Sequence, residues 1–273
     1  MLPRVTIIIA NYNYDRYISE SIQSAIDQDY EGPLTVCVID DGSTDSSWEK
    51  IQSLFLDEEC EYIDDMKVIS GYVERNKQER VKLIGIKTRN GGASVARNTG
   101  IDFCIEDTDV YAILDSDDIY YSNKITRCID KIIEDDRIGA VYADYSILNV
   151  DTGATRHECK FPYSKKVLER HCIVHSGALI TKSALLHVKE DGYYYDPSLH
   201  GPAGEDFIGC AEDYDLWIRI SEQFMMVHVP VELALAREGA HNQTANVTSE
   251  IHSKNLERIY SKKQARLNVG SSQ

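Results

Sequence analysis

Short apolar runs alternate with amphipathic stretches through the first half of the chain. Each run is rich in β-branched residues and apolar on both faces, which is typical of a strand buried inside a parallel sheet. The runs are Val5–Ala10, Leu34–Ile39, Val81–Ile86 and Val110–Leu114. Strands that alternate with helices predict right-handed βαβ units and a mostly parallel sheet flanked by helices.

The stretches between these runs have apolar residues at helical spacing. The first helix is expected to bury Ile18, Ile22, Ala25 and Ile26, and a later one Ile125, Ile129, Ile132 and Ile133. A capping box, Ser46 to Glu49, predicts the start of the second helix, with a core stripe of Trp48, Ile51, Leu54 and Phe55. The helix that opens at Gly91-Gly92 carries small residues, so we expect it to lie close to the sheet.

The remaining segments have less regular patterns. Residues 57–80 have no clean period, and we expect a surface insertion with a short helix. Strands are expected at Ala140–Val150 and Ser176–Thr181, a loop at Asp191–Gly209 and a helix at Glu212–Ser221. No linker separates two units, so the halves 1–118 and 119–240 are expected to merge into one domain. Residues 241–273 then form a loop and a basic helix.

Composition excludes some classes of function. The 273 residues have a net charge of −16, which repels nucleic acid in general. A nucleotide ligand remains compatible with that charge, because a bound divalent cation can invert the local sign. Seven scattered cysteines without a C-x-x-C pair suggest neither a disulfide framework nor a zinc knuckle. With no apolar segment long enough to span a bilayer, we expect a cytoplasmic protein.

Three polar clusters follow predicted strands, at residues 10–13, 40–43 and 115–118. In such sheets ligands bind beyond the carboxyl ends of the strands, so the topology brings the clusters into one crevice. Asp115 and Asp117 are two residues apart, a spacing at which their carboxylates can converge on one Mg²⁺ or Mn²⁺ ion. Phosphate oxygens and water would complete the coordination shell of that ion. A solvated acidic turn that caps the next helix is the alternative.

Five stretches together resemble the inverting glycosyltransferases of family 2, which have the GT-A fold, a Rossmann-like sheet. They occur in the family's order and cover roughly residues 4 to 241. The stretches are Val5–Asn13, Asp40–Asp45, Asn90–Gly100, Asp115–Asp118 and Glu212–Trp217. The resemblance implies transfer of a sugar from a nucleotide-diphosphate sugar, commonly a UDP-sugar, to a hydroxyl of a glycan, lipid-linked or protein acceptor.

The resemblance also implies roles for the donor-binding residues. Tyr12, with Ala10 beside it, would lie against the nucleotide base, and Asp41 would accept a hydrogen bond from the base. Arg97 would help to hold the donor. Ser116 belongs to the same donor-binding set.

For the metal and the chemistry, Asp117 would be the main ligand of Mn²⁺ or Mg²⁺, and Asp115 would serve both metal and ribose. Asp213 would be the general base that takes the proton of the acceptor hydroxyl, and Glu212 would support it. His241 is a further candidate ligand. The usual proline after this histidine is replaced by Asn242, which leaves the loop geometry open.

The sequence is also compared with other classes of nucleotide-binding protein. A nucleotidyltransferase would need a glycine-rich, basic loop after the first strand, which Ala10–Asn13 does not offer. A non-catalytic nucleotide- or glycan-binding module of the same fold is the main alternative. The basic helix Ile251–Leu267 can either face solvent or touch an anionic membrane surface weakly.

Overall fold

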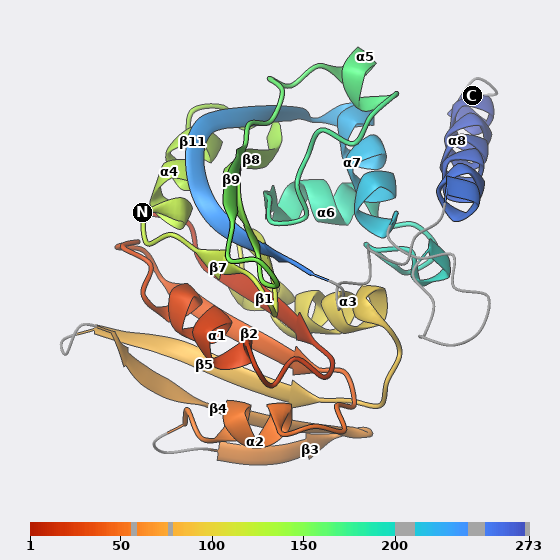
Figure 1. Ribbon diagram of the computed structural model, residues 1–273. Coiled ribbons are helices and arrows are strands. Elements are labelled where there is room, and N and C mark those ends of the chain that lie inside the picture. The colour runs from red at the N-terminus through yellow and green to blue at the C-terminus, as the bar shows by residue number, and fades with distance from the viewer. Residues whose placement is uncertain (56–58, 76–78, 200–210, 240–248, 271–273) are drawn as a thin grey trace.

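The computed structural model describes residues 1–55, 59–75, 79–199, 211–239 and 249–270. Within these residues an 11-stranded sheet has the order β3-β4-β5-β2-β1-β6-β10-β8-β11-β7, and β9 pairs with β8 (Figure 1). The strands are β1 Val5–Asn11, β2 Leu34–Asp40, β3 Glu59–Ile63, β4 Met66–Arg75, β5 Glu79–Lys87, β6 Val110–Asp115, β7 Ile119–Tyr120, β8 Ile138–Asn149, β9 Thr155–Glu158, β10 Leu179–Thr181 and β11 Met225–Glu238.

Four parallel strands, β5, β2, β1 and β6, form the part of the sheet that the apolar runs predict. Ala10 lies beside Ile39 on one side and Asp115 on the other. The carboxyl ends of β1, β2 and β6 therefore meet at one edge, as expected. Pairings further out include antiparallel ones, between β4 and β5 and between β6 and β10, so the complete sheet is mixed.

Helices cover both faces of the sheet. Side chains of α1, α2 and α4 share one apolar core with one face, and those of α3, α6 and α7 share a second core with the other. The helices are α1 Ile18–Ile26, α2 Ser47–Gln52, α3 Ala93–Phe103, α4 Lys124–Ile132, α5 Lys165–Leu168, α6 Lys182–Val188, α7 Glu212–Gln223 and α8 Ser249–Gly270, with short 3₁₀ turns η1 Ile105–Asp107 and η2 Pro197–Leu199.

The close approach of α3 to the sheet is confirmed. A Cβ atom on Gly100 would lie 2.5 Å from Cδ1 of Ile39 and 3.2 Å from Cδ1 of Ile8. Glycine therefore lets the helix backbone rest on side chains of β2 and β1. This contact sets the distance between α3 and the sheet, and therefore the position of Arg97 at the sheet edge.

The short helix expected in residues 57–80 does not occur in the part of this segment that the structure describes. The described part of this segment forms β3 and β4, an antiparallel pair that extends the sheet beyond β5. Val68, Ile69 and Val73 are buried on these strands, whereas every residue of β3 is exposed. Because only part of the segment packs on the core, its apolar residues follow neither the helical period nor the strand period continuously.

The structure also differs from the sequence prediction at the start of α2 and at β11. The predicted capping box does not form, because the Ser46 hydroxyl donates to Asp15 at 2.5 Å and Asp45 caps the first turn through the Ser47 amide. The long strand β11 was not predicted. Pro230 interrupts its sequence pattern, and the pairing with β8 shifts register between Val229 and Glu232. A proline at an irregularity of this kind hides a strand from sequence analysis.

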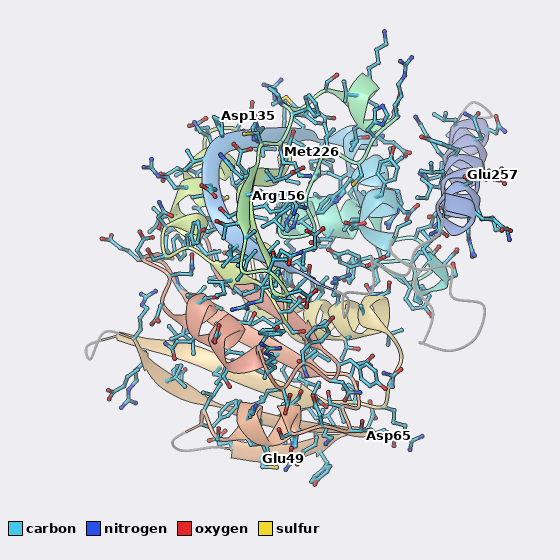
Figure 2. The ribbon with its side chains drawn as sticks, viewed as in Figure 1. Glu49, Asp65, Asp135, Arg156, Met226 and Glu257 are labelled. Atoms are coloured by element: carbon cyan, nitrogen blue, oxygen red, sulfur yellow. The ribbon has the colours of Figure 1, made fainter. Side chains whose placement is uncertain are left out.

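The basic C-terminal helix is confirmed as α8, which lies at the outside of the molecule (Figure 1). Lys262, Lys263 and Arg266 form ion pairs with acidic residues of the main body. Glu257 is exposed on this helix (Figure 2). Membrane contact stays a prediction. None of the helices among the described residues has the length and apolar character that a membrane span requires.

Candidate active site

The acidic run begins at Asp115, the last residue of β6. Its Oδ1 accepts a hydrogen bond from Nη2 of Arg97 at 2.9 Å, and its Oδ2 accepts one from the Ser176 hydroxyl at 2.9 Å. Burial alone would raise the pKa of this carboxyl, but the positive charge of Arg97 lowers the pKa below its usual value. Asp115 is therefore held as a carboxylate in a fixed orientation.

The next acidic residues lie in the turn between β6 and β7. Asp117 and Asp118 are both buried, at 9% and 8% exposure. Oδ1 of Asp118 accepts a hydrogen bond from the backbone N–H of Arg237 on β11 at 2.9 Å. Burial, followed by the negative charges of Asp117 and Asp115, raises the pKa of Asp118 well above its usual value. Asp118 thus anchors β11 to the turn, and is the least suited of the three to bind a ligand.

The turn fits a hard divalent cation. Its side chains offer carboxylate oxygens, the ligand type that Mg²⁺ and Mn²⁺ prefer. The negative charges of Asp117 and Asp115 already disfavour ionisation of Asp118, and they also add to the effect of burial that raises the pKa of Tyr14. A cation would relieve this repulsion. Asp117 and Asp115 are the described candidates to hold it. His241 lies outside the described residues.

Arg97 connects two halves of the site. Its Nη1 donates to Oε1 of Glu212 on α7 at 2.7 Å, and its Nη2 donates to Asp115. The side chain is buried, and its guanidinium carbon lies 5.4 Å from the centre of the Tyr195 ring. Burial would lower the pKa of Arg97, but the two carboxylates raise it above its ordinary value. The guanidinium therefore stays positively charged and pairs with two carboxylates, Asp115 and Glu212, that lie far apart in the sequence.

Asp213 lies next to Glu212 in the first turn of α7. Its Oδ1 accepts a hydrogen bond from the backbone N–H of Tyr214 at 2.7 Å. Burial, followed by the negative charge of Glu212, raises the pKa of Asp213 to about 7, against the opposing effect of Arg97. A carboxyl that titrates near neutral pH can accept and release a proton under physiological conditions, as general bases do.

Asp41 secures the loop that precedes α3. Its two carboxylate oxygens accept hydrogen bonds from the backbone N–H groups of Gly91 and Gly92, both at 2.8 Å. Burial nevertheless raises the pKa of Asp41. Gly42 has φ +73°, and a Cβ there would lie 2.7 Å from the Asn90 nitrogen, so this bend requires glycine. Contact of Asp41 with a nucleotide base stays a prediction.

The other predicted donor-binding residues gather at the same edge of the sheet. Ala10 is half-buried near the end of β1, and Tyr12 is half-buried just after it. Ser116 is buried in the turn after β6. The hydrogen-bond register of β1 and β6 sets Ala10 beside Asp115, which brings the two clusters together.

Further residues line this edge of the sheet, and most of them carry no sequence motif. Ser176 and His175 precede β10, where no motif marks them, and His175 lies against the ring of Tyr145 at 4.1 Å between centroids. Arg237 places its guanidinium 4.7 Å from the centre of the Tyr17 ring. Tyr195 is 1% exposed, and its hydroxyl has no hydrogen-bond partner among the described residues. Its position after two other tyrosines was the one available signal.

Comparison with known proteins identifies the family that the sequence motifs resemble. Residues 6–188 match the family model described as Glycosyl transferase family 2. The chain is 26% identical over 231 residues to a chondroitin synthase and to a hyaluronan synthase of Pasteurella multocida. These alignments cover 84% of this chain but 20% of each synthase, so the chain spans about a fifth of those relatives.

Solved structures with the same fold have lower identity. TarS of S. aureus in complex with UDP-GlcNAc aligns with TM-score 0.60 and 16% identity, over 90% of this chain and 61% of that one. The mannosyltransferase PcManGT of Pyrobaculum calidifontis, in complex with GDP-Man and Mn²⁺, aligns with TM-score 0.60 and 16% identity, over 97% of this chain and 65% of that one.

Proposed function

The chain belongs to glycosyl transferase family 2, and we propose that it transfers a sugar from a nucleotide-diphosphate sugar, a UDP-sugar in the first instance, to an acceptor hydroxyl with inversion at the anomeric carbon. The observation that carries this proposal is the Arg97 bridge. It ties Asp115 at the predicted donor site to Glu212, the neighbour of a carboxyl with a pKa near 7.

We assign residues 1–118 to donor binding and 119–240 to the acceptor half of one domain. Tyr12 and Ala10 would contact the base, with Asp41 and Ser116 close by. Arg97 and Ser176 hold the Asp115 carboxylate in one orientation, so this group is already positioned before a donor binds. Preorganised groups lose little freedom when a ligand binds.

Asp117 and Asp115 would hold Mn²⁺ or Mg²⁺. When bound, such a cation offsets the negative charge of the diphosphate and the charge that develops on it as a leaving group. The solved relative with Mn²⁺ and GDP-Man supports this assignment by analogy of fold.

Asp213 would act as the base. One of its carboxylate oxygens takes the proton of the acceptor hydroxyl as the acceptor oxygen bonds to the anomeric carbon. The nucleotide diphosphate departs from the opposite face with the electron pair of the broken C–O bond, and the configuration inverts. Glu212 supports the base by raising its pKa, and Arg97 keeps that rise from going further. A positioned base contributes typically 10²–10⁴-fold in rate.

The test is a donor panel. The protein is incubated with Mn²⁺ and single UDP- or GDP-sugars, and release of free nucleotide is measured. We expect slow release from one donor, abolished by chelation of the metal. The Asp117→Ala variant is expected to lose metal-dependent nucleotide binding. The same binding and release by Asp117→Ala as by the unaltered protein would contradict the metal assignment.

A non-catalytic binding module is the alternative. Such a module gains nothing from a carboxyl whose pKa is raised to about 7, since ionising it in the folded state is unfavourable. The raised pKa of Asp213 therefore favours an enzyme. A protein that bound a nucleotide sugar tightly but released no nucleotide from any donor, with a range of glycans added as acceptors, would support the module.

A further inference from the structure

We propose a second cation site, selective for zinc, formed by Asp144 on β8 together with His157 and Cys159 at β9. One ligand atom from each side chain can be chosen so that all three atoms lie within 4.8 Å of one another. None of these residues belongs to the candidate active site, and the inference does not depend on the proposed function.

The backbone register explains why the three side chains converge. In the antiparallel pair of β8 and β9, Tyr145 lies opposite Glu158 and Ser146 opposite His157. Continued by one residue, this ladder sets Asp144 opposite Cys159. Side chains on a strand alternate between faces, so Asp144, His157 and Cys159 share one face of the hairpin.

The separations suit a tetrahedral metal after a small adjustment. Zinc binds nitrogen and oxygen at about 2.0–2.2 Å and sulfur at about 2.3 Å, which places tetrahedral ligand atoms roughly 3.3–3.8 Å apart. The ring nitrogens of His157 lie 3.9 and 4.0 Å from Sγ of Cys159. Both residues are exposed, so their side chains can rotate inward without disturbing the core.

Asp144 is the fixed member of the set. It is 5% exposed, and its Oδ1 accepts hydrogen bonds from the Lys160 backbone N–H at 2.7 Å and from Nε2 of His228 at 2.8 Å. Both contacts are made by Oδ1, and within the described part of the chain Oδ2 makes no hydrogen bond, so Oδ2 can serve as a ligand. Carboxylates held in this way by neighbouring groups are typical of metal sites, because the hydrogen bonds orient the ligand.

The donor set distinguishes this site from the acidic turn after β6. A thiolate and an imidazole favour zinc, whereas the carboxylates of Asp115 and Asp117 favour Mg²⁺ or Mn²⁺. Three protein ligands leave a fourth position for water. The site lies in the hairpin that carries Arg156, the residue before His157 (Figure 2). Bound zinc would fasten β9 to β8.

The first test uses thiol protection in the full reduced chain at pH 7, with Mg²⁺ in excess to occupy the acidic turn. A maleimide reagent is added with and without one equivalent of Zn²⁺, and modification of each cysteine is followed by peptide mass spectrometry. We expect Zn²⁺ to slow modification of Cys159 by at least about 10-fold, since a coordinated thiolate is shielded. Cys60, exposed on β3, serves as the internal control and should react at an unchanged rate.

The second test removes a ligand. His157→Ala should weaken Zn²⁺ binding by at least about 10-fold, measured by competition with a chromophoric chelator. Because His157 is exposed, this variant is expected to fold normally. His171→Ala, which removes another exposed histidine, is the matched control and should bind as the unaltered chain does. Equal protection of Cys159 and Cys60, or unaltered affinity in His157→Ala, would overturn the proposal.

Discussion

Asp213 sits in surroundings that work against its charge. Burial and the neighbouring Glu212 raise its pKa to about 7, so the group exchanges its proton near neutral pH. If Asp213 must be unprotonated to accept the acceptor's proton, kcat/KM should fall about tenfold for each pH unit below about 7 and level off above it. Rates measured from pH 5.5 to 8.5 check this. Nucleotide affinity over the same range separates loss of the base from loss of donor binding, and a flat rate profile would argue against Asp213.

The same shift has a consequence for stability. An ordinary aspartate in the unfolded chain has a pKa of about 3.9, lower than the value in the folded protein. Between these two pH values the folded chain holds a proton that the unfolded chain has lost, so this residue makes the free energy of unfolding fall as pH rises from about 4 to about 7. At pH 8, Asp213→Asn should therefore melt at the same temperature as the unaltered protein or above it. A clearly lower melting temperature would mean that the carboxylate stabilises the fold.

Tyr195 is the residue we expect to contribute most among those that no motif marked. Burial raises the pKa of its phenol. Arg97 opposes this rise, and the charges of Asp213 and Glu212 add to it, so the hydroxyl lies within electrostatic range of both carboxyl groups. A buried hydroxyl without a partner in the described chain costs stability, which suggests that a substrate supplies the partner. Tyr195→Phe should lower kcat/KM about 3- to 10-fold, consistent with one hydrogen bond. Thermal stability should stay the same or rise.

The neighbouring residue supplies a matched control. The Tyr194 hydroxyl donates to Oδ1 of Asp102 at 2.9 Å and accepts from Nζ of Lys189 at 3.3 Å, so Tyr194→Phe removes hydrogen bonds within the protein. This variant should lose about 1 kcal/mol of stability and keep its kcat/KM. If Tyr195→Phe behaved in the same way, its hydroxyl would have a structural role only.

At the level of elements, α8 acts as an ionic clamp on the main body. Nζ of Lys262 lies 2.9 Å from Asp196, 3.1 Å from Glu190 and 3.6 Å from the buried Asp215. Lys262→Gln leaves these carboxylates without that cation, and we expect a loss on the order of 2 kcal/mol in the free energy of unfolding, measured by chemical denaturation. Lys254→Gln is the control, since Lys254 and its partner Glu250 are exposed, and it should leave the free energy of unfolding nearly unchanged. Equal losses would show that α8 contributes no ionic clamp.

The elements that could be predicted from sequence are those with one strong local signal. The four parallel strands could be predicted because both of their faces are buried, which gives continuous apolar runs. Helices α1 and α4 could be predicted because their apolar residues recur at helical spacing. The β3–β4 pair could not be predicted in this way, since β3 lies exposed at the edge of the sheet. Strand β11 was hidden by Pro230 and by the register shifts beside it. In both cases pairing with a distant strand decides the structure, and the local sequence carries little of that information.

At the scale of the whole molecule, the candidate site is assembled from β1, β2, β6, α3 and α7. Sequence analysis predicted that the clusters after β1, β2 and β6 would meet, because parallel strands end at one edge. It placed Arg97 and Asp213 only through the resemblance to a family. The ion pairs of Arg97 with Asp115 and Glu212 depend on how close α3 and α7 lie to the sheet, which no local pattern specifies. The positions of the Ser176 and Tyr195 hydroxyls in the site also depend on tertiary packing.

In the proposed mechanism Asp213 performs the chemistry, beside a donor site that forms without it. The measurement that tests this most directly compares the unaltered protein with Asp213→Asn in two assays, metal-dependent nucleotide binding and nucleotide release from the donor that the panel identifies. Asparagine keeps the size of the side chain and removes the base. We predict nucleotide affinity within about 3-fold of the unaltered protein and release slowed by at least about 100-fold. Normal release by Asp213→Asn would show that Asp213 is not the base.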